Sequence, residues 1–281
     1  IISIWDTFEK SWGGSIEGSL AIGNFDEDDD FEIVMADPSE NAGGIFDGDN
    51  LIGFNNEGVI YIYNMDGSIV DGWPRYTEGI IFSSPVVGDI DNDGKDDIVV
   101  GLQYASDIFP EENLGGLYAF DKNGNILPGW PYKQGYNFWS TPALGDLNND
   151  EKLEIATSRL GFKTSLLYHN GSIIEGWPRT TAWNSYYSDM LADVNGDGKL
   201  DVLTTSGGIY SCDEFGKGCG GVYAWDINSG FVSGFPKVTE IDAQGPLNVF
   251  DNEGSVHIAA SSDFDMTSKN SKYRGSVYVW E

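Results

Sequence analysis

Basic residues are scarce in this sequence. Its 281 residues include 15 Lys and Arg against 45 Asp and Glu, which gives a formal net charge of −30. Such an acidic surface repels phosphate backbones and anionic lipid headgroups, so the composition argues against binding to nucleic acid or to anionic membranes. Because too few cationic side chains are present to pair with the carboxylates, a metal cation is the natural missing partner.

Long apolar runs, helical periodicity and histidine are also missing or rare. No apolar run approaches the roughly 18 residues that a membrane-spanning helix needs, so no direct membrane insertion is expected. No segment shows a convincing 3.6-residue period, so almost no helix is expected. The only histidines, His169 and His257, do not assemble into a Ser-His-Asp arrangement or a zinc cluster, so the chain is not expected to be an enzyme.

Cysteine occurs twice, as Cys212 and Cys219 in the Gly-rich stretch SCDEFGKGCGG. Their short separation favours a local disulfide, which points to an oxidising compartment and to an extracellular or cell-surface location. Two free thiols, or half of a metal site, are the alternatives. The sequence starts with IISIWD, without Met or a signal-peptide pattern, so we expect a mature or excised product.

What the sequence does contain is an acidic motif that recurs along the chain. Glycine is abundant at 37 residues, which suits tight turns between short strands, and 40% hydrophobic residues suffice for a core. The motif reads GNFDEDDDFEIVMA from Gly23, GDIDNDGKDDIVVG from Gly88, GDLNNDEKLEIATS from Gly145 and ADVNGDGKLDVLTT from Ala192, with a degraded copy, NVFDNEGSVHIAAS, from Asn248. Their unequal spacing indicates a repeated supersecondary unit with variable loops.

A second motif lies between these copies, as in GGLYAFDKNGNILPGWPY, and reads strand, turn, strand. Each unit is therefore expected to have four strands, of which DIVVGL exemplifies the second and ILPGWP the fourth. Repeated four-stranded units predict an all-β fold, a β-propeller of antiparallel blades. We expect one domain of five blades: 12–79, 80–135, 136–182, 183–240 and 241–281.

The two ends of the sequence suggest how the ring closes. SIWDTFEK, residues 3–10, aligns without gaps on SIVDGWPR, residues 68–75, and the chain ends in GSVYVWE, which reads as a third strand. Residues 1–11 are therefore expected to complete the last blade. A fragment cut from a larger propeller at the same phase would look identical.

The two motifs resemble FG-GAP or VCBS-type repeats, the units of the integrin α-subunit propeller and of many secreted microbial proteins and lectins. The resemblance covers nearly the whole chain and rests on the D-x-D-x-D-G-x-x-D core together with the Gly-Trp-Pro strand. It implies a calcium loop at the first turn of each blade.

The residues of the acidic motif fit that implication. In a turning loop, the residues at positions 1, 3, 5, 7 and 9 can converge on one point. Ca²⁺ takes six to eight hard oxygen ligands and fits this arrangement better than Mg²⁺, which prefers strict octahedral geometry. The lysines at position 7 would offer only their carbonyls. Four Ca²⁺ sites are predicted: Asn24, Asp26, Asp28, Asp30 and Glu32; Asp89, Asp91, Asp93, Lys95 and Asp97; Asp146, Asn148, Asp150, Lys152 and Glu154; and Asp193, Asn195, Asp197, Lys199 and Asp201.

Local differences distinguish the copies. Gly94 and Gly198 supply the backbone freedom that the sharp turn at position 6 needs, whereas Asp29 and Glu151 replace glycine there. The degraded copy has Val249 and His257 where oxygens are expected, so no ion is predicted in it. Solvated acidic loops without any ion are the alternative for all copies.

The opposite face of the blades has the longer loops and is the candidate for ligand binding. Residues six positions before each calcium motif are expected to ring the mouth of the central channel: Glu17, Phe82, Trp139, Tyr186 and Asp242. Aromatic and carboxylate groups there could stack on a sugar or hold a peptide. Alternatively, these aromatics pack between blades.

These observations favour an extracellular, calcium-stabilised module that binds a glycan or a protein. A structural subunit or domain of a cell-surface assembly, contacting neighbouring subunits, is the first alternative. A polysaccharide lyase-like enzyme is the second, since some microbial lyases carry propellers with similar loops.

Overall fold

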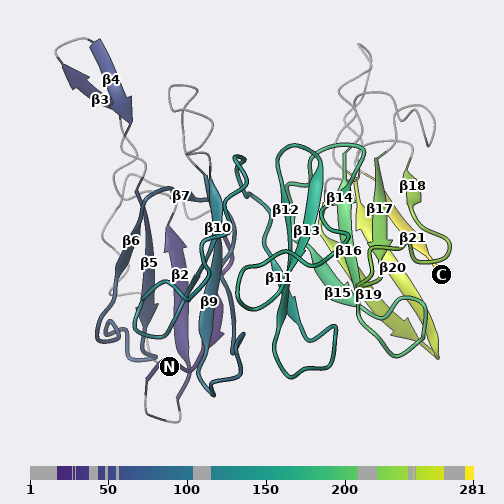
Figure 1. Cartoon of the computed structure of the whole chain (residues 1–281), viewed down its shortest axis with the longest axis horizontal. Coiled ribbons are helices and arrows are strands. Elements are labelled where there is room, and N and C mark those ends of the chain that lie inside the picture. Colours follow the sequence, from purple (N-terminus) through teal and green to yellow (C-terminus); the bar gives the residue numbers. More distant parts are fainter. Residues whose placement is uncertain are drawn as a thin grey trace. The chain divides into compact units, whose positions relative to one another are not determined.

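The computed structural model is built from short β-strands (Figure 1). It describes residues 18–26, 28, 30–37, 44–47, 50–54, 57–103, 115–207, 220–239, 243, 245–262 and 276–281, with only the backbone described in 44–54. No helix occurs in these residues, so none there is long and apolar enough to cross a membrane. The expected all-β fold is confirmed. The chain divides into two compact units, Ile1–Trp139 (unit 1) and Ser140–Glu281 (unit 2).

The first sheet of unit 1 has four antiparallel strands in chain order. They are β1 (Ala21–Gly23), β2 (Glu32–Asp37), β5 (Gly58–Tyr63) and β6 (Arg75–Thr77). Between β2 and β5 the chain forms a separate hairpin of β3 (Gly44–Asp47) and β4 (Asn50–Phe54), which pair only with each other. No strand was predicted in this segment from the sequence.

The second sheet of unit 1 has a divided first strand. Strand β9 (Asp97–Gln103) pairs on one side with β10 (Gly116–Phe120) and on the other with both β8 (Val86–Gly88) and β7 (Ile80–Ile81). The fourth strand is reduced to a bridge at Tyr132, which exchanges two backbone hydrogen bonds of 3.0 and 2.9 Å with Leu117.

Unit 2 contains three further sheets. The first two have four antiparallel strands each: β11 (Ala143–Gly145), β12 (Glu154–Arg159), β13 (Lys163–Leu167) and β14 (Arg179–Thr180), then β15 (Met190–Ala192), β16 (Asp201–Ser206), β17 (Gly220–Trp225) and β18 (Lys237–Thr239). The third has β19 (Leu247–Asn252), β20 (Ser255–Ser261) and β21 (Val277–Trp280). Residues 3–10, predicted to add its fourth strand, lie outside the described residues, so closure stays a prediction.

Successive sheets within each unit pack face to face. In unit 1, Ile60 and Ile62 of β5 share a buried core with Tyr118 and Phe120 of β10. In unit 2, Leu166 of β13 is buried with residues of β17, and alternate residues of β17 are buried with residues of β20. One side of each third strand therefore points to the next sheet, which is how blades of a propeller pack.

The fourth strand begins later than the sequence prediction placed it. The paired residues are Arg75–Thr77, Arg179–Thr180 and Lys237–Thr239, which all follow the predicted Gly-Trp-Pro or Gly-Phe-Pro segment. The reason is a second turn: the Trp73 amide donates to the Val70 carbonyl at 3.1 Å before the ladder resumes. The following proline has no N–H to contribute to a ladder.

The tryptophans of these segments fasten one sheet to the next. Trp73 is buried and its indole N–H donates to the carbonyl of Lys122 at 3.0 Å, and Trp177 donates to Ile227 at 2.9 Å. Each acceptor lies in the turn after the third strand of the following sheet. In these two cases the tryptophan fastens one sheet to the next by burial and by a hydrogen bond.

Candidate metal centres

Four acidic loops connect the first and second strands of four sheets. They are loop 1 (residues 24–32), loop 2 (89–97), loop 3 (146–154) and loop 4 (193–201). In each, position 9 pairs in the ladder with the residue just before position 1, as Asp97 does with Gly88. The equal register explains why the same spacing of side chains recurs.

The carboxylate at position 9 is buried in every loop: Glu32, Asp97, Glu154 and Asp201 are at most 3% exposed. Each accepts a hydrogen bond from the backbone N–H of position 2, over 2.7 Å from Phe25, 3.1 Å from Ile90, 2.9 Å from Leu147 and 3.2 Å from Val194. One oxygen therefore holds the loop closed at its base. The apolar side chain at position 2 is buried in loops 1, 2 and 3.

Burial works against the charge of these four groups. It raises the pKa of Asp97 to about 7 and that of Asp201 to about 6, with neighbouring loop carboxylates adding to the effect. The pKa values of Glu32 and Glu154 are raised for the same reasons. A cation among these carboxylates would remove the repulsion and favour the ionised form.

The carboxylate at position 1 organises the turn. Asp89 accepts the backbone N–H groups of Asp93 and Gly94 at 2.9 and 2.8 Å, and Asp146 does the same for positions 5 and 6 of loop 3. In loop 4, Asp193 accepts from four backbone N–H groups, which lower its pKa although partial burial opposes them. The loops are thus preformed by hydrogen bonds within them.

Position 6 has a left-handed backbone in loops 2, 3 and 4. Gly94 and Gly198 have φ of 86° and 82°, and Glu151 adopts 69° in loop 3. Glu151 therefore has a strained backbone, since a residue with a Cβ pays about 1 kcal/mol or more in this region. Asp29 lies outside the described residues.

Carboxylate oxygens converge most closely in loops 1 and 2. One oxygen from each of Asp26, Asp28 and Glu32 lies within 4.8 Å of the others, and the same holds for Asp89, Asp91 and Asp97. In loop 2, Oδ1 of Asp91 is buried and has no hydrogen-bond partner. An anionic oxygen in that state is costly unless a cation completes its environment.

Loops 3 and 4 have asparagine at position 3 and therefore one carboxylate fewer than loop 2. Asn148 donates its amide to Asp150 at 3.1 Å and to Glu154 at 2.8 Å. That amide group bridges the carboxylates that a cation would bridge, so it must turn its oxygen inward before loop 3 can bind one. In loop 4, the Asn195 oxygen accepts the backbone N–H of Asp197 at 2.9 Å.

The donor sets fit Ca²⁺. They consist of carboxylate, amide and carbonyl oxygens, the hard ligands that Ca²⁺ prefers, and they include no thiol or imidazole. Asp30, Asp93 and Asp197 at the loop surface, and the carbonyls of Lys95, Lys152 and Lys199, complete the predicted sets. Lys95 and Lys199 are exposed, as their predicted role as carbonyl ligands requires.

The degraded copy folds differently. Strands β19 and β20 pair without interruption up to Asn252 and Ser255, and a two-residue turn of Glu253 and Gly254 joins them. Both turn residues have positive φ, at 55° and 88°. Phe250 stacks on His257, which stands where the other blades have the buried carboxylate of position 9.

Comparison with known families agrees with this geometry. Residues 82–119, which include β8, loop 2, β9 and all but the last residue of β10, match the family model of the FG-GAP repeat. This segment is an FG-GAP repeat. The other three loops repeat the hydrogen bond from position 2 to position 9 that this FG-GAP repeat has.

Two solved structures share the fold. The V. cholerae biofilm matrix protein Bap1 superposes with a TM-score of 0.57 and 16% identity, over 96% of this chain and 40% of Bap1. BBS1N, solved in complex with ARL6DN, superposes with a TM-score of 0.51 and 8% identity, over 98% of this chain and 78% of BBS1N. This chain thus spans less than half of the length of Bap1. Among curated proteins, none matches in sequence.

The FG-GAP repeat and the face-to-face four-stranded sheets identify the fold as a β-propeller fold with antiparallel blades. The number of blades, the blade boundaries and closure of the ring stay predictions.

The predicted ligand-binding residues are only partly described. Phe82, the first residue of the matched FG-GAP segment, lies beside Trp139, with ring centroids 6.2 Å apart and planes tilted by 57°. In unit 2, Tyr186 accepts a hydrogen bond from the Asn184 amide at 3.2 Å. Glu17 and Asp242 lie outside the described residues, as do Cys212 and Cys219 with their predicted disulfide.

The burial of Asp189 was not predicted from the sequence. Asp189 is 5% exposed and accepts hydrogen bonds from Ser140 Oγ at 2.9 Å and from the backbone N–H and Oγ of Ser158, each at 2.6 Å. Burial raises its pKa to about 6, although these hydroxyls and that of Thr204 lower it. One sequence feature could have singled it out: Asp189 directly precedes β15, whereas proline directly precedes β8, β11 and β19.

Proposed function

We propose that this chain is a calcium-stabilised FG-GAP propeller module that acts outside the cell in binding or adhesion. The single observation that carries the calcium part is the buried, unpartnered Oδ1 of Asp91 within the group formed with Asp89 and Asp97. Calcium there would supply the missing partner and offset the repulsion among carboxylates, which adds to the effect of burial in raising the pKa of Asp97. Its role is structural: it fixes the first turn of the blade.

The four loops are expected to differ in calcium affinity. Loops 1 and 2 have four carboxylates each among the predicted ligands, and loops 3 and 4 have three. Because the number of charged ligands sets calcium affinity in oxygen-donor sites, we expect loops 1 and 2 to bind more tightly. Loop 3 should bind weakest, since Asn148 must rotate and Glu151 holds a left-handed backbone.

Thermal melts in calcium, in chelator, and in chelator with added magnesium test the calcium part. We expect chelation to lower the melting temperature and calcium to restore it, with magnesium much less effective. At 100 times its Kd, one ion would stabilise the folded chain by about 2.7 kcal/mol. Asp91→Ala should reduce the calcium-dependent shift, whereas Asp71→Asn, which removes a carboxylate from an exposed turn, should not. An unchanged melt would mean that the loops are solvated turns.

The binding and adhesion part rests on the fold and on one neighbour. FG-GAP propellers are typical of extracellular proteins, and Bap1 is a biofilm matrix protein. Rigid blades hold the aromatic pair Phe82 and Trp139 on the connections away from the calcium loops, which suits a glycan or protein ligand. A glycan array probed in calcium, with Trp139→Phe and Trp139→Ala as the matched pair, tests this.

A structural role in a surface assembly is the second candidate, and the matrix location of Bap1 favours it. It predicts no saturable small ligand but calcium-dependent self-association. Sedimentation of the chain at increasing concentration, with and without calcium, separates the two: saturable glycan binding by a monomer supports the binding module, and reversible assembly without it supports the structural role.

A further inference from the structure

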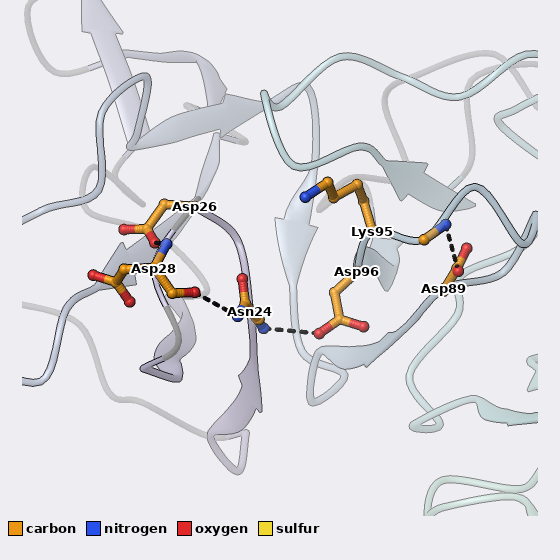
Figure 2. Close-up of a pocket in the computed structure, with 7 residues that line it drawn as sticks. Asn24, Asp26, Asp28, Asp89, Lys95 and Asp96 are labelled. Atoms are coloured by element: carbon orange, nitrogen blue, oxygen red, sulfur yellow. Dashed lines mark hydrogen bonds between the residues drawn. The ribbon is translucent and has the colours of Figure 1, made fainter.

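Loops 1 and 2 are joined by a residue that belongs to neither predicted set of calcium ligands. Asp96 is at position 8 of loop 2, and its Oδ2 accepts the backbone N–H of Asn24 at 2.8 Å (Figure 2). Asn24 is position 1 of loop 1. Both loops line one open hollow of about 770 Å³, into which Lys95 also extends.

The position of Asp96 in the chain ties it to the ion in loop 2. The residue before it, Lys95, offers its carbonyl as a predicted ligand, and the residue after it, Asp97, offers its buried carboxylate. An ion in loop 2 would therefore fix the backbone on both sides of Asp96. Its carboxylate would then be held at the Asn24 amide.

On the other side, the Asn24 backbone leads directly into loop 1. The Asn24 side-chain amide donates to the backbone carbonyl of Asp28 at 3.0 Å. The backbone N–H of Asp28 in turn donates to Oδ1 of Asp26 at 2.9 Å. Gly23 precedes Asn24, and a Cβ there would lie 2.9 Å from Asp96 Oδ2, 2.5 Å from Val87 and 2.8 Å from Phe25. The approach of the carboxylate thus depends on a glycine.

Unit 2 shows that the blade contact itself does not need a carboxylate. The counterpart of Asp96 in loop 4 is Leu200, which packs beside Leu191 over Gly145, the residue just before loop 3. An apolar side chain fills the same place there. The hydrogen bond from Asn24 to Asp96 is therefore an addition to the contact, specific to loops 1 and 2.

We propose that Asp96 is a positioning residue that couples the two calcium sites, so that an ion in loop 2 tightens binding in loop 1. This inference rests on the proposed calcium function and adds to it a regulation of one site by the other. By linkage, an ion in loop 1 tightens loop 2 by the same factor. The carrier is the hydrogen bond, because it joins a residue flanked by loop 2 ligands to the first residue of loop 1.

The experiment is hydrogen–deuterium exchange of the full chain during a calcium titration. Peptides covering residues 18–37 and 86–103 report the calcium midpoints of loops 1 and 2 separately. Asp91→Ala removes a predicted ligand of loop 2, and Oδ1 of Asp91 makes no hydrogen bond in the metal-free loop that the change would break. When Asp96 is present, we expect Asp91→Ala to raise the calcium concentration at the loop 1 midpoint about 5–10-fold.

The same comparison with Asp96→Leu completes a double-mutant cycle. Leucine is the residue of loop 4, so the blade contact should survive, which a melt in chelator verifies. With leucine, disabling loop 2 should leave the loop 1 midpoint unchanged. Asp96→Asn keeps an acceptor oxygen without the charge and should retain the coupling, which separates the hydrogen bond from simple electrostatic attraction.

The outcomes are distinct. If both peptides respond to calcium but the loop 1 midpoint ignores Asp91→Ala, the coupling is refuted and the calcium function stands. Equal midpoint shifts with Asp96 and with leucine would assign the coupling to another contact and also refute the proposal. If neither peptide responds to calcium, the proposed calcium function fails, and the coupling fails with it.

Discussion

Asp189 in unit 2 makes the stability of the chain depend on pH in a calculable way. Its pKa is raised from 3.8 to about 6 by burial, so the folded chain binds this proton more tightly than the unfolded chain does. Stability from this group is fully present below pH 3.8 and is lost as the pH rises through 6. Since a tenfold change in proton affinity is worth about 1.4 kcal/mol, the full loss is about 3 kcal/mol, most of it between pH 4 and 7.

Asp189→Asn removes the titration but keeps an oxygen that can accept from the Ser158 amide and hydroxyl. We therefore expect the difference in free energy of unfolding, variant minus wild type, to increase by about 2–3 kcal/mol between pH 4 and pH 7. Urea unfolding at fixed calcium across this range measures it. The raised pKa values of the loop carboxylates act on both proteins alike and cancel in the difference.

Two checks keep this reasoning open to refutation. Asp71→Asn in an exposed turn should give a curve parallel to the wild type. The ¹³C shift of the Asp189 carboxyl during a pH titration gives its pKa directly, whether or not the variant folds well. A pH-independent difference between wild type and Asp189→Asn, or a titration near 3.8, would show that burial does not control this group.

Two smaller predictions concern single contacts. Gly94→Ala should lower the free energy of unfolding by about 1 kcal/mol through the φ of 86° alone, because nothing lies within 4 Å of the added Cβ. Glu151→Ala should lower it by almost nothing, since this residue already has a Cβ at a φ of 69°. Equal urea midpoints for the two variants would contradict the backbone argument. Trp177→Phe should cost about 1 kcal/mol more than Trp225→Phe, because the Trp177 indole N–H donates to Ile227 at 2.9 Å and that of Trp225 has no hydrogen-bond partner. Paired urea titrations measure this difference, and a larger cost at Trp225 would assign the effect to packing instead.

The repeat made much of the fold predictable. Copies of one motif fix the same turn again and again, so the spacing from Asp89 to Asp97 already gave the loop register that the ladder between Gly88 and Asp97 displays. In the third strands a period-two pattern is less informative: Ile60 and Ile62 of β5 are buried beside half-buried Tyr61 and Tyr63, but β10 and β17 are buried along their whole length. Successive side chains of a strand point to opposite faces, so a strand that is covered on both faces carries no alternation.

Other features were not predictable from the repeated pattern. The late start of the fourth strand follows from a turn hydrogen bond that recurs at Trp73, Trp177 and Phe235, and nothing in the strand pattern announces it. The hairpin of β3 and β4 lies in an insertion with no counterpart to compare. The burial of Asp189 depends on Ser140 and Ser158, which are far from it in sequence. Long-range contacts of this kind leave no periodic trace.

The link from Trp73 to Lys122, and from Trp177 to Ile227, bears on how such a chain can grow. In both cases the indole precedes the fourth strand of one sheet, and the carbonyl follows the third strand of the next sheet. A sequence repeat that contains both the Gly-Trp-Pro segment and that turn therefore holds one half of a joint to each neighbour. Duplicating such a repeat would copy both halves together, whereas the repeat with Phe235 in place of the tryptophan has no indole N–H to donate.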